Sequence, residues 1–531
     1  MKTYQKKNRR FYFGALASIL IGTIFSVCLQ FFKGDVLDFA AAGNISDTVR
    51  STALLFVFIL FECLFYFLYD RFSAGFVVGC TRALKHDIFQ NILSWGYVSF
   101  KEHNSGEYLA RYTSEADAIK NHHFQMLPML WEILFKIILV SAALFVLDWR
   151  IAIVTIGLLT TPLYIPKLIE KPLQNAQSSY LEAVAENLSM VNDWLSGFEI
   201  IKNYSIEHRI MAKFRTANDS TMDKLMHDTQ LGNISRLITT LISYLSYFVV
   251  LTCAAWLVLK GSFTAGDFFV AIGMIDQLSY PLISLAGIIR QLIAVKPACA
   301  AMETFLTASK STKAGQSVNN LSRSLNFRDV SFSYDGTHPI VDHFNFTIAK
   351  GKRYLLKGPS GCGKTTIINL LLKYYEPTAG LIEIDGIPLN DFSSTYGLIT
   401  VVRQEATLFR DTLRNNLTMY QDLPDEAITN ALVSVGLARF ANSHSLNSII
   451  TEGGDNFSGG EKKRICLARA LLRNTDVLIL DEPLANLDPE TAQRIEDLLF
   501  SIRDKTLLVV SLQFTEEKLM RFDQVIDFTT T

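Results

Sequence analysis

Long apolar runs alternate with polar stretches over about the first 300 residues and then stop. Six of these runs are long enough to cross a bilayer as helices, because about 20 helical residues span the hydrocarbon core. The pattern therefore predicts a membrane domain with six transmembrane helices. The six runs cover Phe11–Phe32, Thr52–Tyr69, Met126–Leu147, Ile151–Ile169, Leu237–Leu259 and Phe268–Ile293.

Charge indicates on which side of the membrane the chain begins. Basic residues precede the first run, and cytoplasmic segments carry an excess of Lys and Arg. The run is also too long for a signal peptide. Six spans return the chain to the side on which it began, so we expect everything after the last span to be cytoplasmic. The basic residues are Lys2, Lys6, Lys7, Arg9 and Arg10.

The loops between the spans are very unequal in length. Asp148–Arg150 and Lys260–Asp267 are short and predicted to be external, whereas residues 70–125 and 170–236 are long and predicted to be cytoplasmic. The long segments contain few helix breakers, so we expect the membrane helices to continue into the cytoplasm as hairpins. Independent cytoplasmic subdomains are the alternative. The hairpin turns are expected near Phe100–Gly106 and Phe198–Tyr204.

Charged residues inside the spans are costly in a bilayer and need a reason. Glu132 and Lys136 lie four residues apart and can pair on one helix face, which favours a structural pair over a transport role. Glu62, Asp276 and Gln277 have no such local partner. We interpret them either as the lining of a polar cavity or as helix–helix contacts.

The segment Gly358–Thr366 reads GPSGCGKTT and fits the phosphate-loop pattern G-x-x-x-x-G-K-[ST]. A strand-like run precedes it and a helix-like run follows it, which is the context that such a loop requires. Lys364 is expected to reach the β- and γ-phosphates of ATP, and Thr365 to offer a hydroxyl to Mg²⁺. The predicted phosphate-binding residues are Gly358, Pro359, Ser360, Gly361, Cys362, Gly363, Lys364, Thr365 and Thr366.

The chain changes character around this motif. Residues 310–324 are rich in Ser, Thr, Asn and Lys, which is typical of a linker. We therefore predict an all-α transmembrane domain of six helices at 1–309, a linker at 310–324, and a C-terminal α/β P-loop NTPase domain at 325–531. A net charge of −1 gives no indication of a nucleic-acid partner. Seven scattered cysteines form no C-x-x-C pair, so we expect no disulfide or zinc framework.

Two further motifs support nucleotide chemistry. The apolar run Val477–Leu480 ends in Asp481 and Glu482. Asp481 is a candidate Mg²⁺ ligand, and Glu482 is a candidate catalytic residue that orients or activates the attacking water. Ser458–Glu461 begins a basic helical stretch and is a second anion-seeking helix N-terminus. One ATP does not need two such loops, so we expect two domains to share two nucleotides head to tail.

With these motifs together, the chain resembles a half-size ATP-binding cassette (ABC) exporter over nearly its whole length. The resemblance implies that Tyr334 stacks on adenine, that Gln404 contacts Mg²⁺ and senses the membrane domain, and that Asp488 lies in a loop crossing the dimer interface. Phe457–Glu461 is similar to the family signature, with Phe for the usual Leu and Glu for the usual Gln, and Glu452 resembles the acidic residue before it. The implied nucleotide contacts of the signature are Ser458, Gly459, Gly460 and Glu461, and the two regions resembling the family's coupling segments are Phe100–Asp117 and Gly197–Lys202.

One position departs from the family pattern. A histidine usually follows the magnesium-binding Asp by about 31 residues, but this sequence has Leu512 there, followed by Gln513. Leucine cannot hydrogen-bond a γ-phosphate, so we expect an impaired site although Glu482 is present. In the family such losses often mark one half of a heterodimer with unequal ATP sites, which we favour over a homodimer.

The resemblance implies ATP-driven export of an amphipathic small molecule, lipid or peptide across the cytoplasmic membrane, with a second half-transporter as partner. The alternative is a nucleotide-gated or regulatory membrane protein that binds ATP but hydrolyses little. Because the chain enters the membrane by Phe11, we expect no peptidase domain ahead of it. The sequence does not identify the transported substrate.

Overall fold

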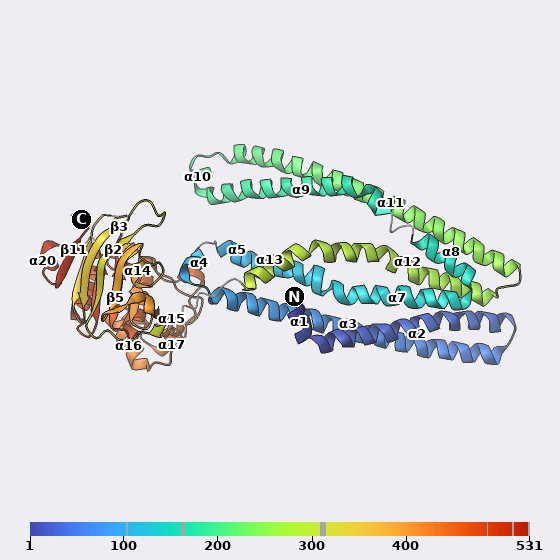
Figure 1. Cartoon of the computed structure of the whole chain (residues 1–531), viewed down its shortest axis with the longest axis horizontal. Helices are drawn as coiled ribbons and strands as arrows, with labels where there is room; N and C mark the ends of the chain where they lie inside the picture. The colour runs from blue at the N-terminus through green and yellow to red at the C-terminus, as the bar shows by residue number, and fades with distance from the viewer. Residues whose placement is uncertain are drawn as a thin grey trace. The chain divides into compact units, whose positions relative to one another are not determined.

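The computed structural model describes residues 1–101, 105–160, 165–307, 315–359, 361–485, 487–511 and 514–528 (Figure 1). The chain forms two compact units. Unit 1 comprises Met1–Leu93 and Ser105–Ala308, and unit 2 comprises Ser94–Asn104 and Ser309–Thr531. A short segment from the first third of the chain thus packs with the C-terminal part.

Unit 1 is entirely helical among its described residues. Two π-helical turns, at Arg111–Glu115 and Lys120–Phe124, interrupt the helices between α5 and α7. The helices are α1 (Lys2–Lys7), α2 (Arg9–Ala41), α3 (Ile45–Leu93), α5 (Ser105–Ala110), α6 (Ala116–Ile119), α7 (Met126–Leu147), α8 (Trp149–Leu159), α9 (Ile165–Ser196), α10 (Phe198–Asn203), α11 (Glu207–Leu259), α12 (Ala265–Ala294) and α13 (Lys296–Thr307).

Five of the six predicted spans lie in helices that are long and apolar enough to cross a membrane, within the described part of the chain. They belong to α2, α3, the helical stretch ending in α7, α11 and α12. The remaining prediction, Ile151–Ile169, coincides with the shorter apolar helix α8 and the start of α9, and residues 161–164 lie outside the described ones.

Parts of the long polar segments continue apolar runs within single helices: residues 70–93 belong to α3 and residues 207–236 to α11. α3 runs unbroken for 49 residues and α11 for 53. In Figure 1, α9 and α11 lie side by side and are joined by the short helix α10 at the tip. The other turn contains α4 (Tyr97–Lys101), which belongs to unit 2.

α2 and α12 approach each other closely near one end. A Cβ added at Gly34 would come within 2.9 Å of the Gly266 carbonyl oxygen, so small residues are required at this crossing. Asp38 of α2 accepts hydrogen bonds from the Gly266 N–H at 2.7 Å and from the Thr264 hydroxyl at 2.6 Å. These contacts fix α12 against α2.

Unit 2 contains two main sheets. The first is a five-stranded parallel sheet in the order β11-β4-β10-β9-β8, and the second is a four-stranded antiparallel sheet in the order β3-β2-β5-β6. The strands are β1 (Gln316–Ser317), β2 (Ser324–Phe332), β3 (Val341–Ala349), β4 (Arg353–Lys357), β5 (Ala379–Ile384), β6 (Ile387–Pro388), β7 (Phe392–Ser394), β8 (Ile399–Val402), β9 (Val477–Asp481), β10 (Thr506–Val510) and β11 (Gln524–Asp527). The helices longer than one turn are α14 (Lys364–Leu371), α15 (Leu413–Thr418), α16 (Asp425–Ser434), α18 (Gly459–Leu472) and α19 (Pro489–Ser501), and the short ones are α17 (Ser443–Leu446) and α20 (Glu516–Leu519).

The register of the parallel sheet brings the ends of distant strands together. Val510 of β10 pairs with Leu356 of β4 on one side and with Asp481 of β9 on the other. Val402 of β8 pairs with Leu480 of β9. Every residue of β9 and β10 is buried, as expected for strands covered on both faces. The carboxyl ends of β4, β10, β9 and β8 therefore form one edge, where ligands bind in open α/β sheets.

Candidate functional site

The phosphate loop connects β4 to α14 at this edge. Gly361 and Gly363 have φ angles of 86° and 100°, a region that L side chains rarely adopt. A Cβ at Gly363 would also come within 3.0 Å of the Ile340 carbonyl oxygen. The glycines therefore let the backbone turn sharply into α14, whose N-terminus begins at Lys364. Ser360 lies outside the described residues.

The Lys364 side chain folds back over the first residues of the phosphate loop. Its ammonium donates to the carbonyl oxygens of Gly358 at 2.6 Å and Pro359 at 2.8 Å, and its residue is only 9% exposed. The backbone of the phosphate loop therefore surrounds the buried ammonium of Lys364. Thr365 is exposed and Thr366 is buried at the start of α14. Cys362 lies 3.6 Å from the Lys364 ammonium as a free thiol.

Tyr334 lies just after β2, next to the phosphate loop. Its hydroxyl is 3.3 Å from the Thr366 hydroxyl, so the strand and the helix meet here. The ring packs edge-on against Phe332 and Tyr375, with centroids 4.9 Å and 5.0 Å apart. Half of the residue stays exposed, which leaves ring surface available to a flat ligand.

Asp481 and Glu482 stand at the end of the central strand β9. Burial raises the pKa of Asp481, and the charges of Arg403, Lys364 and Lys463 oppose that shift. Burial and the neighbouring Asp481 charge both raise the pKa of Glu482, in the direction that suits a general base. Glu482 has a φ of 51°, unusual for a residue with a side chain, which turns the chain sharply off the strand.

Lys463 secures that turn, and sequence reasoning missed it. From α18, its ammonium donates to the main-chain carbonyls of Glu482 at 3.0 Å and Ala485 at 2.9 Å. Burial lowers the pKa of Lys463, and the carboxylates of Glu482 and Asp481 oppose that shift. The helix that starts at the signature segment is therefore bonded to the loop carrying the candidate catalytic carboxylate. No local motif could reveal a bond that joins residues 19 apart along the chain.

With hydrolysis at any partner site blocked, we expect Lys463→Met to lower the rate of ATP hydrolysis at this chain's own site about tenfold and to leave the KM for ATP nearly unchanged. Methionine retains the length of the side chain but cannot bond the two carbonyls, so the strained turn at Glu482 is no longer held. Steady-state ATPase kinetics measure both constants. Lys350→Met, which removes a surface ion pair with Asp476, is the control. A changed KM with an unchanged kcat would contradict a positioning role.

Gln404 follows β8 and is exposed at the same edge. Its neighbour Arg403 donates to the Asn369 side chain at 2.8 Å and lies over the ring of Tyr374 at 6.0 Å. Tyr374 in turn stacks on Tyr97 of α4, with centroids 3.9 Å apart and ring planes 13° apart. Within unit 2, α4, which begins three residues before the first predicted coupling region, is thus linked by aromatic and cation–π contacts to Arg403, the residue next to Gln404.

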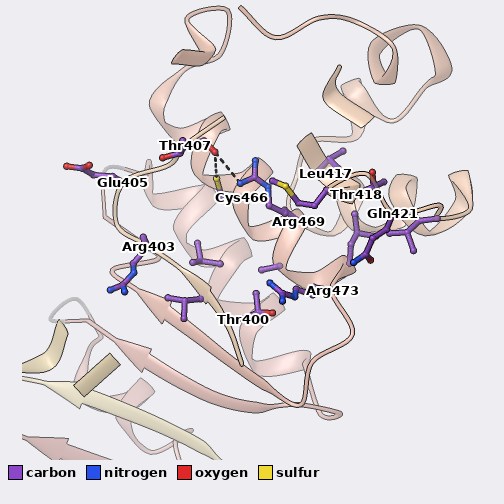
Figure 2. A pocket seen from close by; sticks show the side chains of 16 residues that line it. Thr400, Arg403, Glu405, Thr407, Leu417, Thr418, Gln421, Cys466, Arg469 and Arg473 are labelled. Carbon is purple, nitrogen blue, oxygen red and sulfur yellow. Dashed lines mark hydrogen bonds between the residues drawn. The ribbon is translucent and has the colours of Figure 1, made fainter. Parts of the chain in front are cut away.

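A cavity of about 460 Å³ adjoins the loop that carries Gln404. Figure 2 shows that its walls come from β8 and the loop that follows it, from the end of α15 and its following loop, and from α18. The Thr407 carbonyl accepts hydrogen bonds from Arg469 at 3.2 Å and from the Cys466 thiol at 3.8 Å across this wall. The phosphate-loop residues do not line it. The cavity is therefore separate from the phosphate site, although both border the Gln404 loop.

The signature segment forms a capped helix start. The Ser458 hydroxyl accepts from the Glu461 N–H at 3.3 Å, while the Glu461 carboxylate accepts from the Ser458 N–H at 2.8 Å, which completes a capping box. Arg439 forms an ion pair with Glu461 and neutralises it. Gly459 and Gly460 begin α18 behind this cap. Among the described residues, no hydrogen bond joins this segment to the phosphate loop, so the structure keeps the two anion sites of one chain apart.

Glu452 precedes α18 in the sequence and Asp488 follows it. Asp488 caps α19, and the hydrogen bond from the Thr491 N–H at 2.9 Å holds the pKa of its carboxyl below the usual range. Glu452 is exposed in a single 3₁₀ turn, Glu452–Gly454. Leu512 and Gln513 lie outside the described residues.

Comparisons with known proteins agree with this arrangement. The family profile described as "ABC transporter transmembrane region" matches residues 12–282, and the profile described as "ABC transporter" matches residues 341–485. The fold and site thus define a membrane transporter with an ATP-hydrolysing domain. The chain belongs to the ABC transporter family, with the domain order of a half-size exporter, and is an ATPase coupled to transport across a membrane.

Individual relatives are distant. The ATP-dependent lipid A-core flippase of Syntrophus aciditrophicus is 26% identical over 443 residues, which cover 81% of this chain and 72% of the flippase. The beta-(1→2)glucan export ATP-binding/permease protein NdvA of Bartonella bacilliformis is 25% identical, covering 90% of this chain and 82% of NdvA. A solved structure of a bacterial Atm1-family ABC exporter with ATP bound aligns with 98% of this chain and 93% of the exporter chain. The TM-score is 0.78 and the sequence identity is 22%, so this similarity supports the fold.

Proposed function

We propose that this chain drives the export of an amphipathic small molecule, lipid or peptide across the cytoplasmic membrane. The observation that carries the proposal is the gathering of Lys364, Asp481 and Glu482 at one edge of a sheet, in a chain whose other part is a set of long apolar helices. The relatives' names, which specify a lipid A-core flippase and a glucan exporter, support outward movement of large amphipathic or polar cargo.

The residues at the edge fit ATP and Mg²⁺. A buried ammonium surrounded by loop carbonyls is available for phosphate oxygens, and the strained glycines leave space that side chains would fill. The Thr365 hydroxyl, the Gln404 amide and the Asp481 carboxylate are hard oxygen donors of the kind that Mg²⁺ prefers. The ion would neutralise charge on the β- and γ-phosphates. Glu482 would accept a proton from, or orient, the attacking water.

A second half-transporter completes the site in this proposal. The signature segment has no bond to its own phosphate loop among the described residues, so Ser458, Gly459 and Gly460 are free to serve the nucleotide of a partner. Beyond the predicted span, α9 also carries three leucines spaced seven residues apart that are 57–68% exposed. They are Leu181, Leu188 and Leu195. In water such a row needs a protein surface to cover it.

We propose a heterodimer in preference to a homodimer, because Leu512 stands where the family usually has a histidine. Two such chains would both lack that γ-phosphate contact. With a partner that has the histidine, Lys364, Asp481, Glu482 and Leu512 would form the slow site. This chain's signature segment would complete the partner's fast site.

Transport can be tested in inside-out vesicles that contain the full-length chain together with any co-purifying partner. We expect labelled amphiphiles to accumulate inside the vesicles with ATP and not with a non-hydrolysable analogue. Equal accumulation with both nucleotides would support the nucleotide-gated alternative instead. Vesicles from cells without the chain give the background.

The orientation of the chain gives a separate prediction. We expect single cysteines introduced at Trp149 and Ser262 to react with an impermeant maleimide added outside cells, and those at Ser105 and Lys202 to react only after the membrane is opened. The reason is that basic residues precede α2 and that six spans return the chain to the cytoplasm. A variant without the seven native cysteines is the background. Labelling of Ser105 from outside would overturn the six-span topology.

A further inference from the structure

A cavity of about 200 Å³ lies inside the membrane domain, between α2, α3, α7 and α12. Its lining is polar although its walls belong to predicted spans. Asp276 and Gln277, which had two possible interpretations from the sequence, both line it, and Gln277 also bonds to another helix. Glu62 is half-buried on α3 and is not part of the lining. Polar groups at this depth are costly and need a purpose.

The one positively charged side chain among the residues that line the cavity is already paired. The Lys136 ammonium donates to Glu132 at 2.8 Å, which confirms the pair predicted from their spacing. The Gln277 amide nitrogen donates to the Ser26 hydroxyl oxygen at 3.0 Å. The Thr23 hydroxyl donates to the main-chain carbonyl one turn before it, at 2.7 Å. Three of the polar side chains at the cavity thus already bond to partners within the protein.

The acceptors around the cavity are in contrast available. Among the described residues, Asp276 has no hydrogen bond and no ion pair, and it is exposed toward the opening. Pro281 lies inside α12 and has no N–H, so it cannot donate to the carbonyl of Gln277 one turn earlier. A carboxylate and a main-chain carbonyl are thus left as neighbouring acceptors on one helix.

We propose that this cavity binds the cationic, amine-bearing head group of the transported amphiphile. The Asp276 carboxylate supplies the charge, the Gln277 main-chain carbonyl accepts an N–H, and the ring of Tyr280, which is 62% exposed, is available to a cation. The ring of Tyr66 is already used, because the Lys136 ammonium lies over it at 5.1 Å. An anionic head group is disfavoured, because Glu132 already neutralises Lys136 and the Asp276 carboxylate then leaves the cavity with a net negative charge. The inference rests on the proposed export function and names the substrate class for it.

Binding can be measured on the full-length chain in nanodiscs, with its partner where one co-purifies, using radiolabelled dodecylammonium. We expect saturable binding above that of empty nanodiscs and much weaker binding of dodecyl sulfate, which has the same tail and the opposite charge. Asp276→Asn should weaken dodecylammonium binding at least tenfold, and Asp276→Glu should retain it. Asp70→Asn, which removes a carboxylate outside the cavity, is the matched control. Equal binding of both amphiphiles, or no loss in Asp276→Asn, overturns the inference.

A second variant tests the carbonyl without changing any charge. Pro281→Ala restores an N–H that can bond the Gln277 carbonyl within α12, so we expect binding to weaken a few-fold. Ser279→Ala on the same helix, whose hydroxyl bonds only the Ile275 carbonyl at 2.8 Å, should bind normally. Monodisperse elution of each variant from gel filtration checks folding. Unchanged binding in Pro281→Ala removes the carbonyl from the site.

The two proposals can fail separately. Binding of dodecylammonium needs no ATP hydrolysis, so Lys364→Ala should retain it while losing turnover. If the wild type transports amphiphiles in vesicles yet does not bind dodecylammonium saturably, the export function stands and the cationic site is wrong. If it binds dodecylammonium and transports nothing, the site stands and the export function is wrong.

Discussion

With hydrolysis at any partner site blocked, replacing Lys364 by alanine is expected to reduce ATP turnover at this chain's own site about 100-fold or more and to leave membrane insertion intact. The Lys364 ammonium lies buried within the phosphate loop, bonded only to loop atoms in the described structure. Its loss removes a preorganised positive charge from beside the β- and γ-phosphates, and loss of one such group typically lowers a rate 10²–10³-fold. Turnover is measured by phosphate release in nanodiscs, and insertion by the yield of folded protein.

Lys352→Ala is a suitable control for this prediction. Lys352 precedes β4, at the end of the strand opposite the phosphate loop, and forms a surface ion pair with Asp523 at 2.9 Å. Exposed pairs contribute little, so turnover should stay near that of the wild type. Undiminished turnover in Lys364→Ala, with hydrolysis at any partner site blocked, would remove the phosphate-loop assignment.

The second large effect concerns the signature segment. If the chain works in a heterodimer, Ser458→Ala should slow hydrolysis about tenfold or more, whereas Glu482→Gln should change it less than about twofold. The reason is that Ser458 would complete the partner's fast site, while Glu482 would serve the slow site with Leu512. Steady-state ATPase rates of the two variants, each with the same partner, give the comparison.

Loss of the helix cap must be separated from loss of a nucleotide contact. Ser458 caps α18, and removing such a cap costs about 1 kcal/mol of stability. Thr412 caps α15 in the same way, accepting from the Asn415 N–H at 3.1 Å, so Thr412→Ala measures the effect of a lost cap alone. Brisk hydrolysis by the purified chain without a partner, abolished by Glu482→Gln, would establish a competent homodimeric site and reject the unequal pair.

The sequence by itself predicted those features that depend on neighbours along the chain. The third span, Met126–Leu147, was predicted with the bounds that α7 has, because a long apolar run in water-free surroundings can satisfy its backbone only as a helix. The phosphate loop was found because its glycines and Lys364 follow a fixed local spacing. The ion pair of Glu132 and Lys136 was predicted because residues four apart lie on the same face of a helix.

Tertiary structure alone decided which distant residues meet. Lys463 bonds the turn at Glu482, and Tyr97 stacks on Tyr374, because sheet order and helix packing bring these segments together, and no local periodicity encodes such contacts. Likewise, only the folded structure shows which charged residues of the membrane domain line a cavity. The sequence could place Asp276 inside a span, but only the packing of four helices determined that it lines a cavity beside Gln277, whose amide bonds to Ser26 of another helix.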